Sequence, residues 1–353
     1  MAYIVETQTT FPAQYHSQEE LTEGLIGYLD GASLNPKVLQ RLHQSVSVKG
    51  RYLALPMEDY RKLKDFEDRN IAWGECALAL GEACIRDLLT KADLEAKDVS
   101  ALYFTTVTGL AVPSIDARLV NRMHFRQSLK RVPLFGLGCV AGAAGIARVA
   151  DYLKGHPTEA VILLSVELCS LTIQKGDLSV ANMISSGLFG DGVAAVLLVG
   201  DEHRLAKRGQ PQIIDYESIF FPETEHVMGW NFSNTGFKIV LSADVPGMAQ
   251  HVLPGPAKAF LKRHGLDIPD IDVWVSHPGG PKVITALEQG LGLPEGTLDI
   301  SRESLRDIGN LSSASVLAIL EKTLATRKPV EGNRGVILAM GPGFCAEVIL
   351  VQW

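Results

Sequence analysis

Hydrophobic and polar positions alternate along this chain in two similar series of helix-like and strand-like segments. In the first series, residues 75–89 carry apolar side chains at helical spacing, and an acidic linker separates them from the apolar run 101–104. In the second, a helical pattern from about 255 to 264 leads through another acidic linker to the apolar run 273–276. A spacing of 3.6 residues predicts helices, and short continuous apolar runs predict buried strands. The order helix, turn, strand and loop therefore occurs twice.

The likeness between the two series extends beyond these elements. The linkers 92–99 and 265–272 resemble each other, and a later segment, 137–143, resembles 308–314, each opening a helix. Each of those helices then leads to an apolar strand, at 160–165 and at 335–340. This repetition predicts an internal duplication.

The alignment of the two copies gives Cys139 and Asn310 equivalent positions. The separation from linker aspartate to site residue is 41 in the first copy, from Asp98 to Cys139. It is 38 in the second copy, from Asp272 to Asn310. Matched intervals of this kind support a common unit in both halves.

Apolar strands that alternate with helices indicate parallel-type sheets covered on both faces. Two copies of such a unit predict an α/β fold of five layers, αβαβα, made of two duplicated halves with pseudo-twofold symmetry. We expect residues 1–210 to form the N-terminal half, which contains Cys139. We expect residues 211–353 to form the C-terminal half, which contains His277 and Asn310. The polar, aperiodic stretch from 200 to 212 is the expected junction.

Cys139 lies where an apolar strand ends and a helix of small residues begins. The unpaired N–H groups and positive dipole end of a helix stabilise a thiolate, so we expect a lowered pKa and a nucleophilic role. Small neighbours let a carbonyl group approach the backbone, as in the nucleophile elbow of serine hydrolases. The alternative is an inert cysteine packed in the core.

His277, at a strand end, and Asn310, at a helix start, complete a candidate triad with Cys139. Each residue has a structural alternative, since buried histidines are often only hydrogen-bonded and asparagine often caps helices. Papain-like proteases also use cysteine, histidine and asparagine in this order. Their cysteine motif is missing here, and an asparagine beside serines suits an oxyanion donor better than a residue that orients the histidine.

The composition of the 353-residue chain narrows the classes of function. It is 46% hydrophobic and 21% charged with a formal net charge of -7, which gives no general attraction for nucleic acid or anionic lipid. Five cysteines without a C-x-x-C pair, and histidines without ligand spacing, favour neither disulfides nor a metal site. The start of the chain lacks a signal-peptide pattern, and no apolar run approaches the roughly 20 residues of a membrane span. We therefore expect a cytoplasmic protein.

Five motifs resemble those of the type III polyketide synthases, the chalcone-synthase-like branch of the thiolase superfamily. In order along the chain they are Gly138-Cys139-Val140-Ala141-Gly142, Leu188-Phe189-Gly190-Asp191-Gly192, His277-Pro278-Gly279-Gly280-Pro281, Gly309-Asn310-Leu311-Ser312-Ser313-Ala314 and Gly341-Pro342-Gly343-Phe344. The resemblance runs from about Arg51 to the last residues. Type III ketoacyl-carrier-protein synthases share fold and triad, but their motifs would read H-Q-A-N and G-N-T-S.

The resemblance implies a thiolase-like fold and an acyltransferase that needs no metal or organic cofactor. Cys139 would carry an acyl chain taken from a CoA or carrier-protein thioester. His277 and Asn310 would donate hydrogen bonds to the thioester carbonyl of malonyl-CoA, so that loss of CO2 leaves a stabilised enolate, which attacks the chain on Cys139. Ring closure of an enol oxygen would then release an α-pyrone.

The resemblance also assigns residues around the acyl cavity. Phe189 matches the family's gatekeeping phenylalanine, with a plain core aromatic as the alternative, and its usual partner is replaced by Ile239, which opens the gate. Val112 falls where a residue crosses the dimer interface into the partner's cavity, so a homodimer is implied. The remaining cavity candidates are Cys169, Thr172, Trp230, Ser312 and Met340.

Two basic residues, Lys49 and Arg51, are candidates to bind the phosphates of CoA; the alternative is simple solvated charge. The segments 108–119 and 166–171 look like those of bacterial members that make alkyl-pyrones or alkyl-resorcinols. The sequence therefore favours a homodimeric synthase that extends an aliphatic acyl chain with malonyl-CoA and releases an α-pyrone.

Two further hypotheses remain open. One is a stand-alone ketosynthase that joins two β-keto chains, each bound to acyl carrier protein, into a pyrone antibiotic. The other, from a different class, is a non-catalytic binding protein on a thiolase fold.

Overall fold

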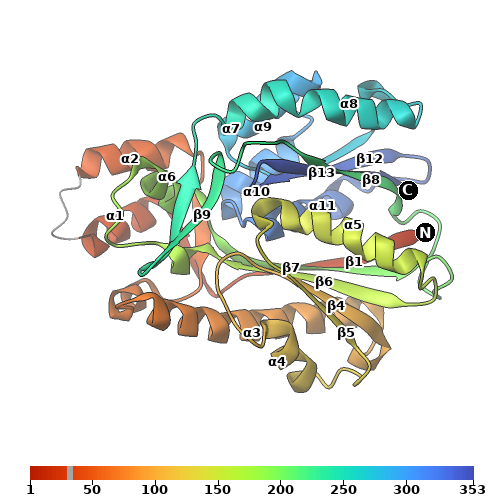
Figure 1. Ribbon diagram of the computed structural model, residues 1–353, viewed down its shortest axis with the longest axis horizontal. Coiled ribbons are helices and arrows are strands. Elements are labelled where there is room, and N and C mark those ends of the chain that lie inside the picture. The colour runs from red at the N-terminus through yellow and green to blue at the C-terminus, as the bar shows by residue number, and fades with distance from the viewer. Residues whose placement is uncertain (30–34) are drawn as a thin grey trace.

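The computed structural model describes residues 1–29 and 35–353 and has five layers of secondary structure (Figure 1). Helices α3 (Phe66–Ala92) and α4 (Ile115–Arg122) cover one outer face. Helices α8 (Pro254–Arg263) and α9 (Pro281–Leu291) cover the other, and α10 (Asp299–Ile308) contacts both α9 and the central helix α11. Between the two sheet layers lie α5 (Ala141–Lys154) and α11 (Ser313–Arg327). The predicted αβαβα architecture is confirmed.

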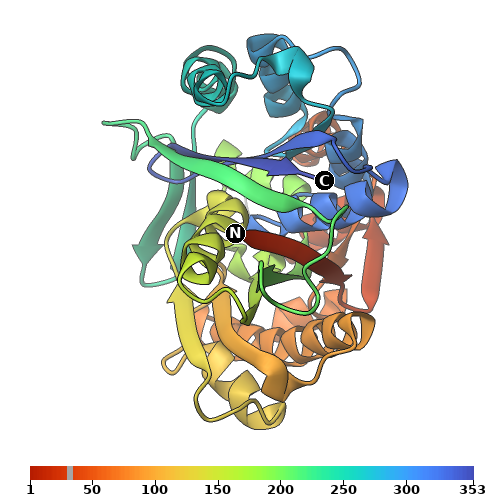
Figure 2. The ribbon, with the colours of Figure 1, turned by 90° about the vertical axis from the view of Figure 1, so that its right-hand side faces the viewer.

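Nine strands are hydrogen-bonded in the order β11-β12-β13-β8-β1-β7-β6-β4-β5. Their bounds are β1 (Ala2–Thr10), β4 (Val99–Thr105), β5 (Lys130–Leu134), β6 (Ala160–Leu168), β7 (Asp191–Gly200), β8 (Gln212–Phe220), β11 (Val273–Ser276), β12 (Arg334–Gly341) and β13 (Cys345–Gln352). The two halves join where β1 pairs with β8 over Ala2–Ile213 and Tyr3–Gln212. Figure 2 shows the halves as two layers that diverge from this junction.

The same strand pairing occurs in both halves, as a duplication requires. In the first half β4 runs parallel to β6, and β6 runs antiparallel to β7. In the second half β11 runs parallel to β12, and β12 runs antiparallel to β13. The expectation of parallel-type sheets is therefore wrong for part of each half. The three residues between β12 and β13 can join only antiparallel neighbours, because a parallel connection needs a crossover of a dozen or more residues.

The two acidic linkers fold alike. Each forms a short 3-10 turn, η2 (Ala96–Asp98) and η6 (Ile268–Asp270), closed by a capping box, Glu95 with Asp98 and Asp267 with Asp270. The structural equivalent of Asp98 is thus Asp270, two residues before the aspartate that the sequence alignment paired with it. The separation to Asn310 becomes 40, counted from 270 to 310, against 41 in the first half.

The central helices meet at their N-terminal ends. A Cβ atom at Gly142, in the first turn of α5, would lie 2.3 Å from the carbonyl oxygen of Ser313 at the start of α11. Only glycine allows the backbones to approach this closely. The largest apolar cluster, which includes Val140, Ile146 and Leu317, surrounds these two helices. The starts of the two central helices therefore lie against each other.

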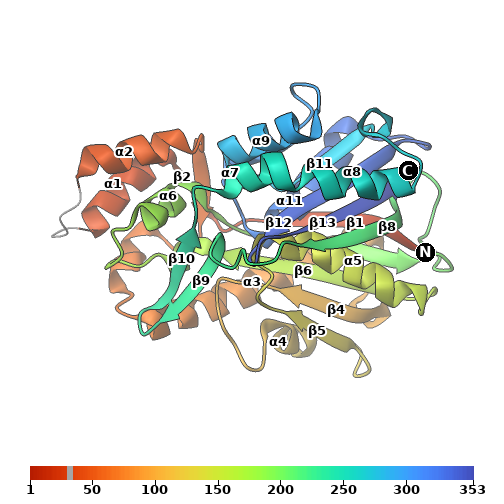
Figure 3. The same cartoon turned by 45° about the horizontal axis from the view of Figure 1, so that its top comes forward.

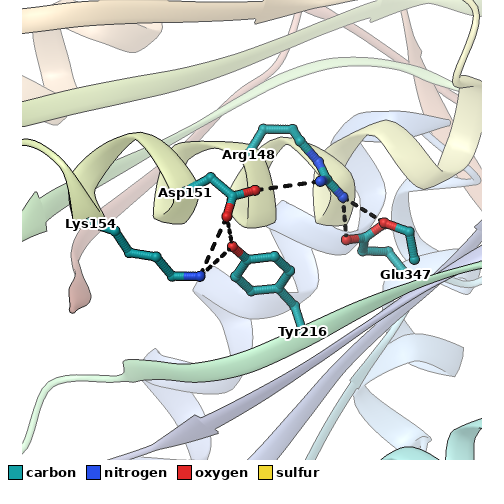
Figure 4. A network of polar contacts seen from close by, with 6 residues as sticks. Arg148, Asp151, Lys154, Tyr216 and Glu347 are labelled. Carbon is teal, nitrogen blue, oxygen red and sulfur yellow. Dashed lines mark hydrogen bonds and ion pairs between the residues drawn. The ribbon is translucent and has the colours of Figure 1, made fainter.

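A polar network fixes the outer side of α5 to the sheet of the other half (Figure 4). Arg148 lies 3.0 Å from Glu347 on β13 and 3.5 Å from Asp151. Lys154 donates a hydrogen bond of 2.8 Å to Tyr216 on β8, and Tyr216 donates to Asp151. These contacts tie the helix that follows Cys139 to strands of the C-terminal half.

The remaining elements gather at one end of the layers (Figure 3). They are β2 (Gln14–Ser17), α1 (Gln18–Tyr28), α2 (Pro36–Ser45), β3 (Gly50–Leu53), α6 (Val180–Leu188) and the hairpin of β9 (Met228–Ser233) and β10 (Gly236–Leu241). Strand β7 ends at Gly200 and β8 begins at Gln212, while the division into halves at residue 210 stays a prediction. None of the described helices is long and apolar enough to cross a membrane.

Candidate active site

Cys139 lies in a 3-10 turn, η3 (Gly138–Val140), directly before α5. Gly138 has a φ of +54°, and a Cβ atom there would lie 2.5 Å from the ring of Pro342. Glycine therefore lets this turn pack against the loop after β12. The Sγ atom of Cys139 is 3.5 Å from the Oγ atom of Ser312, which places the thiol beside the start of α11.

His277 directly follows β11 and is 2% exposed. Its backbone N–H donates to the carbonyl of Leu338 on β12 (2.9 Å), which continues the parallel pairing of the two strands. Its Nδ1 atom has no hydrogen-bond partner among the described residues. Burial lowers the pKa of His277 to about 3, so the imidazole is neutral at physiological pH. A neutral ring with one N–H is suited to donate a hydrogen bond to a substrate.

Asn310 is held by the segment that ends α6. Its N–H donates to the carbonyl of Leu188 (2.9 Å), and its own carbonyl accepts from Gly190 (3.0 Å). Its Oδ1 atom accepts from the backbone N–H of Ser312 (2.8 Å) and from the hydroxyl of Ser315 (3.3 Å). The amide oxygen is therefore occupied, which leaves the Nδ2 group as the donor. Asn310 does not open the helix as predicted, since Ser312 is the N-cap of α11.

Cys139, His277 and Asn310 line one cavity of about 90 Å³. Seven other candidates line it with them, namely Phe189, Cys169, Thr172, Trp230, Ile239, Ser312 and Met340. Ile239 and Trp230 are cross-strand partners in the β9–β10 hairpin. Among the described residues, no aspartate, glutamate, lysine or arginine lines this cavity. The arrangement offers a thiol and two neutral hydrogen-bond donors in apolar surroundings; the role of each residue stays a prediction.

The predicted lowering of the Cys139 pKa is not what the structure gives. Burial raises the pKa of the Cys139 thiol to about 12, and the hydrogen bond from Ser312 opposes this only in part. The reason is that a thiolate here has no cation beside it, because His277 is neutral. Desolvation therefore outweighs the partial charge of the helix end.

Glu167, on β6, lies behind this cavity and was not identified from the sequence. Its carboxyl group accepts hydrogen bonds from the backbone N–H of Val107 (3.1 Å) and the hydroxyl of Thr108 (3.0 Å), and it also bonds the hydroxyl of Ser313. Burial raises the pKa of Glu167 to about 7, against these hydrogen bonds. A buried glutamate inside an apolar strand is the signal that could have pointed to it.

Three candidates do not line the cavity. Val112 is fully exposed at the tip of the segment before α4. Lys49 is exposed, as a phosphate-binding residue requires. Arg51, in contrast, is only 3% exposed, and its guanidinium donates to the carbonyls of Ser186 and Gly187. The side chain of Arg51 is therefore turned into the protein and is not simply solvated, while its binding of CoA phosphates stays a prediction.

The cavity also contains residues that sequence reasoning missed. Ser185 and Ser186 come from α6, and Val107 follows β4. On the far side lie Met228 and Val245. No sequence pattern pointed to these residues, because the fold brings together the ends of elements that are far apart in the chain. The described residues hold no group of three or more His, Cys, Asp or Glu positioned to bind a metal ion.

Two family models match consecutive parts of the chain. The model for the C-terminal domain of chalcone and stilbene synthases matches residues 212–353. The model for FAE1/type III polyketide synthase-like proteins matches residues 61–213.

Individual relatives match over almost the whole length. A 1,3,6,8-tetrahydroxynaphthalene synthase from Streptomyces peucetius subsp. caesius is 46% identical, over 99% of this chain and 93% of that protein. A putative chalcone synthase from Bacillus subtilis (strain 168) is 38% identical, over 100% of this chain and 99% of its own. The crystal structure of 1,3,6,8-tetrahydroxynaphthalene synthase from Streptomyces coelicolor A3(2) superimposes with a TM-score of 0.92 at 30% identity, over 99% of both chains.

Proposed function

The chain belongs to the type III polyketide synthases, enzymes that condense malonyl-CoA, and we propose that it builds a polyhydroxylated aromatic product from malonyl-CoA alone. The 46% identity to a tetrahydroxynaphthalene synthase, over 99% of this chain, carries this proposal. No charged side chain lines the cavity at Cys139 within the described part of the chain, which suits an uncharged growing polyketide chain.

In the proposed cycle the thiol of Cys139 holds the growing chain. It attacks the acyl thioester as a thiolate, formed when its proton passes to the neutral His277. The thiolate of CoA then leaves and takes that proton, which returns His277 to its neutral form. The N–H of His277 and the Nδ2 group of Asn310 then donate to the carbonyl of the next malonyl thioester. In a cavity without charged side chains, one such donor contributes about 3 kcal/mol to stabilising the enolate.

Five malonyl units that each lose one CO2 supply the ten carbons of a tetrahydroxynaphthalene. The second candidate is the release of an alkyl-α-pyrone from an aliphatic starter. It is favoured by the apolar side chains that line the cavity, Ile239, Val240 and Leu241. Condensation of two chains bound to carrier protein is the remaining hypothesis for the same triad.

Mass spectrometry of products separates these candidates. The purified protein is supplied with malonyl-CoA alone, with malonyl-CoA plus a decanoyl-CoA starter, or with two β-ketoacyl carrier proteins. We expect a ten-carbon aromatic product from malonyl-CoA alone. A product that forms only when decanoyl-CoA is added would refute the proposal in favour of the pyrone. A product that forms only from two carrier-bound chains would favour the ketosynthase.

We also propose that the enzyme is a cytoplasmic homodimer. Strand β5 is the edge of the sheet, and Val112 and Leu110 are exposed near it. A second copy that pairs with this edge would cover those side chains. Light scattering on the purified protein tests this: twice the chain mass is expected, and Val112→Asp should shift the equilibrium toward the monomer.

A further inference from the structure

A second cavity lies behind the wall of the cavity that contains Cys139. It measures about 440 Å³ and is enclosed by α1, β3, the 3-10 segment η1 (Met57–Lys62) and the N-terminal part of α3. Ile173 and Ser186 line both cavities and form their common wall. The two cavities differ in one respect above all, which is charge.

Three arginines and one glutamate line the second cavity, Arg51, Arg61, Arg69 and Glu58. Arg51 and Arg69 are 3% and 7% exposed, so most of their surface is out of water. None of these three arginines forms an ion pair with a residue in the described part of the chain. Buried charges are ordinarily paired. Three arginines against one glutamate therefore give the lining an excess of positive charge.

Neutral groups position the two buried guanidinium groups. Arg51 donates through Nη1 to the carbonyl of Gly187 (3.0 Å) and to the side chain of Gln18, and through Nη2 to the carbonyl of Ser186. The Nε atom of Arg51 is buried and has no hydrogen-bond partner among the described residues. Arg69 donates through Nη2 to the carbonyl of Thr235 (2.6 Å). These hydrogen bonds hold the side chains in place without neutralising them. The carboxylates of Asp65 and Asp68 also act on the charge of Arg69, but neither lines the cavity.

The buried carboxylate that acts most strongly on the charge of Arg51 is that of Asp191, which is hydrogen-bonded to other residues. Asp191 accepts from the backbone N–H groups of Ala54 (2.6 Å) and Ser170 (2.8 Å) and from the hydroxyl of Ser170. Burial lowers the pKa of Arg51 to about 10, so the guanidinium stays charged near neutral pH. With three arginines and only one glutamate in its lining, the cavity therefore suits a further anion.

The remaining walls determine what kind of anion fits. Leu21, Leu25, Leu53 and Leu63 are apolar and face the same space. Guanidinium groups match a carboxylate in shape and charge, and leucine side chains match an alkyl chain. We propose that the second cavity binds an aliphatic carboxylate, with its head group at the arginines and its chain along the leucines.

Such a carboxylate has two sources that the experiment must separate. One is a free aliphatic acid from solution. The other is the far end of an acyl chain attached to Cys139, which would have to pass the wall formed by Ile173 and Ser186. A Cys139→Ala protein carries no such chain, so binding of a free acid to it identifies the first source.

Isothermal titration of the full-length protein with octanoate and with 1-octanol tests the proposal. We expect octanoate to bind at one site per chain and 1-octanol to bind at least tenfold more weakly. Arg61 is exposed at the rim and has no hydrogen bond to a described residue, so Arg61→Ala should fold normally. It should weaken octanoate binding about tenfold. The matched control is Lys62→Ala, which removes a neighbouring cation that does not line the cavity.

Three results would overturn the proposal. One is equal affinity for the acid and the alcohol, and another is equal weakening by Arg61→Ala and Lys62→Ala. The third is loss of octanoate binding in Cys139→Ala, which would locate the acid in the catalytic cavity. Leu25→Trp fills the second cavity without changing charge and should abolish binding of octanoate. None of these measurements depends on the product, so the proposed function can fail while this site stands.

Discussion

The two cavities of this protein share a wall and are opposite in character. The cavity at Cys139 is small and uncharged, with His277 and Asn310 as neutral donors. The cavity behind it is about five times larger, 440 against 90 Å³, and contains three arginines. Apolar side chains form much of both linings, so the two cavities differ in the charge of their polar groups, which are neutral in the first and include more cations than anions in the second.

This difference fits the condensation of malonyl-CoA that we propose for the cavity at Cys139. A cation beside malonyl-CoA would stabilise its carboxylate, the group that must leave as CO2. In the cavity of Cys139 the hydrogen-bond donors are instead available for the thioester carbonyl, where negative charge develops. The arginines of the second cavity would have the opposite effect, because they stabilise a bound carboxylate that is not lost as CO2.

The largest effect should come from Cys139→Ala. The variant loses the only proposed attachment point for the acyl chain, so product formation should fall about a thousandfold or more. Intact-protein mass spectrometry should show no acyl adduct after mixing with malonyl-CoA. An adduct that persists in the variant would show that another residue holds the chain.

Asn310→Ala should reduce product formation by about 10² to 10³-fold, because it removes one donor to the enolate oxygen. The measurement is the rate of CO2 release from malonyl-CoA. Ser315→Ala is the matched control: it removes one of the two partners of the Asn310 amide oxygen but keeps the Nδ2 donor. An equal loss of activity in both variants would mean that Asn310 acts by holding the local backbone in place and not by donating a hydrogen bond through Nδ2.

Alkylation of Cys139 by iodoacetamide should be more than tenfold slower at pH 7.5 than that of a free cysteine. A raised pKa means that the thiolate fraction is small at neutral pH and grows as the pH rises. The rate should therefore still increase above pH 8.5, with His277→Ala as the comparison. A plateau below pH 8 would mean that a thiolate–imidazolium pair forms before substrate binds.

The smallest effect is expected from Ile173→Ala, which thins the common wall. Removing its side chain enlarges the cavity of Cys139 toward the arginines and should shift products by one extension unit, with two- to threefold changes in yield. Leu25→Ala, which enlarges only the second cavity, is the control. An identical product profile in both variants would show that the cavities work independently.

Much of the fold could be predicted from the pattern of apolar positions, because the duplication presents the same pattern twice along the chain. The strand 273–276 was predicted with its observed bounds, and 101–104 lies inside β4. The helix predicted at 75–89 is longer, starting at Phe66 behind an Asp65 cap, because its first turns are too polar to show a clear apolar face. The antiparallel pairing was not predicted, because a strand buried on both faces shows the same continuous apolar run whether its neighbour is parallel or antiparallel.

The candidate triad could be placed in one cavity because strand ends and helix starts converge in a duplicated fold. The burial of Arg51 could not be predicted in the same way. A charged residue next to a strand is usually solvated, and only the fold shows that carbonyls of α6 draw its guanidinium inward. The raised pKa of Cys139 was equally beyond the sequence, because desolvation depends on what surrounds the helix end.

The position of β1 has a consequence for how the protein is made on the ribosome. Strands β1, β4, β5, β6 and β7 all precede residue 201, so the first half can complete its own sheet before β8 is synthesised. At that stage the face of α5 that later packs on β12 and β13 is still bare. The apolar cluster around Val140 and Ile146 closes only when the last forty residues emerge. The nascent chain is therefore most exposed to aggregation late in translation, at the same surface that becomes the centre of the enzyme.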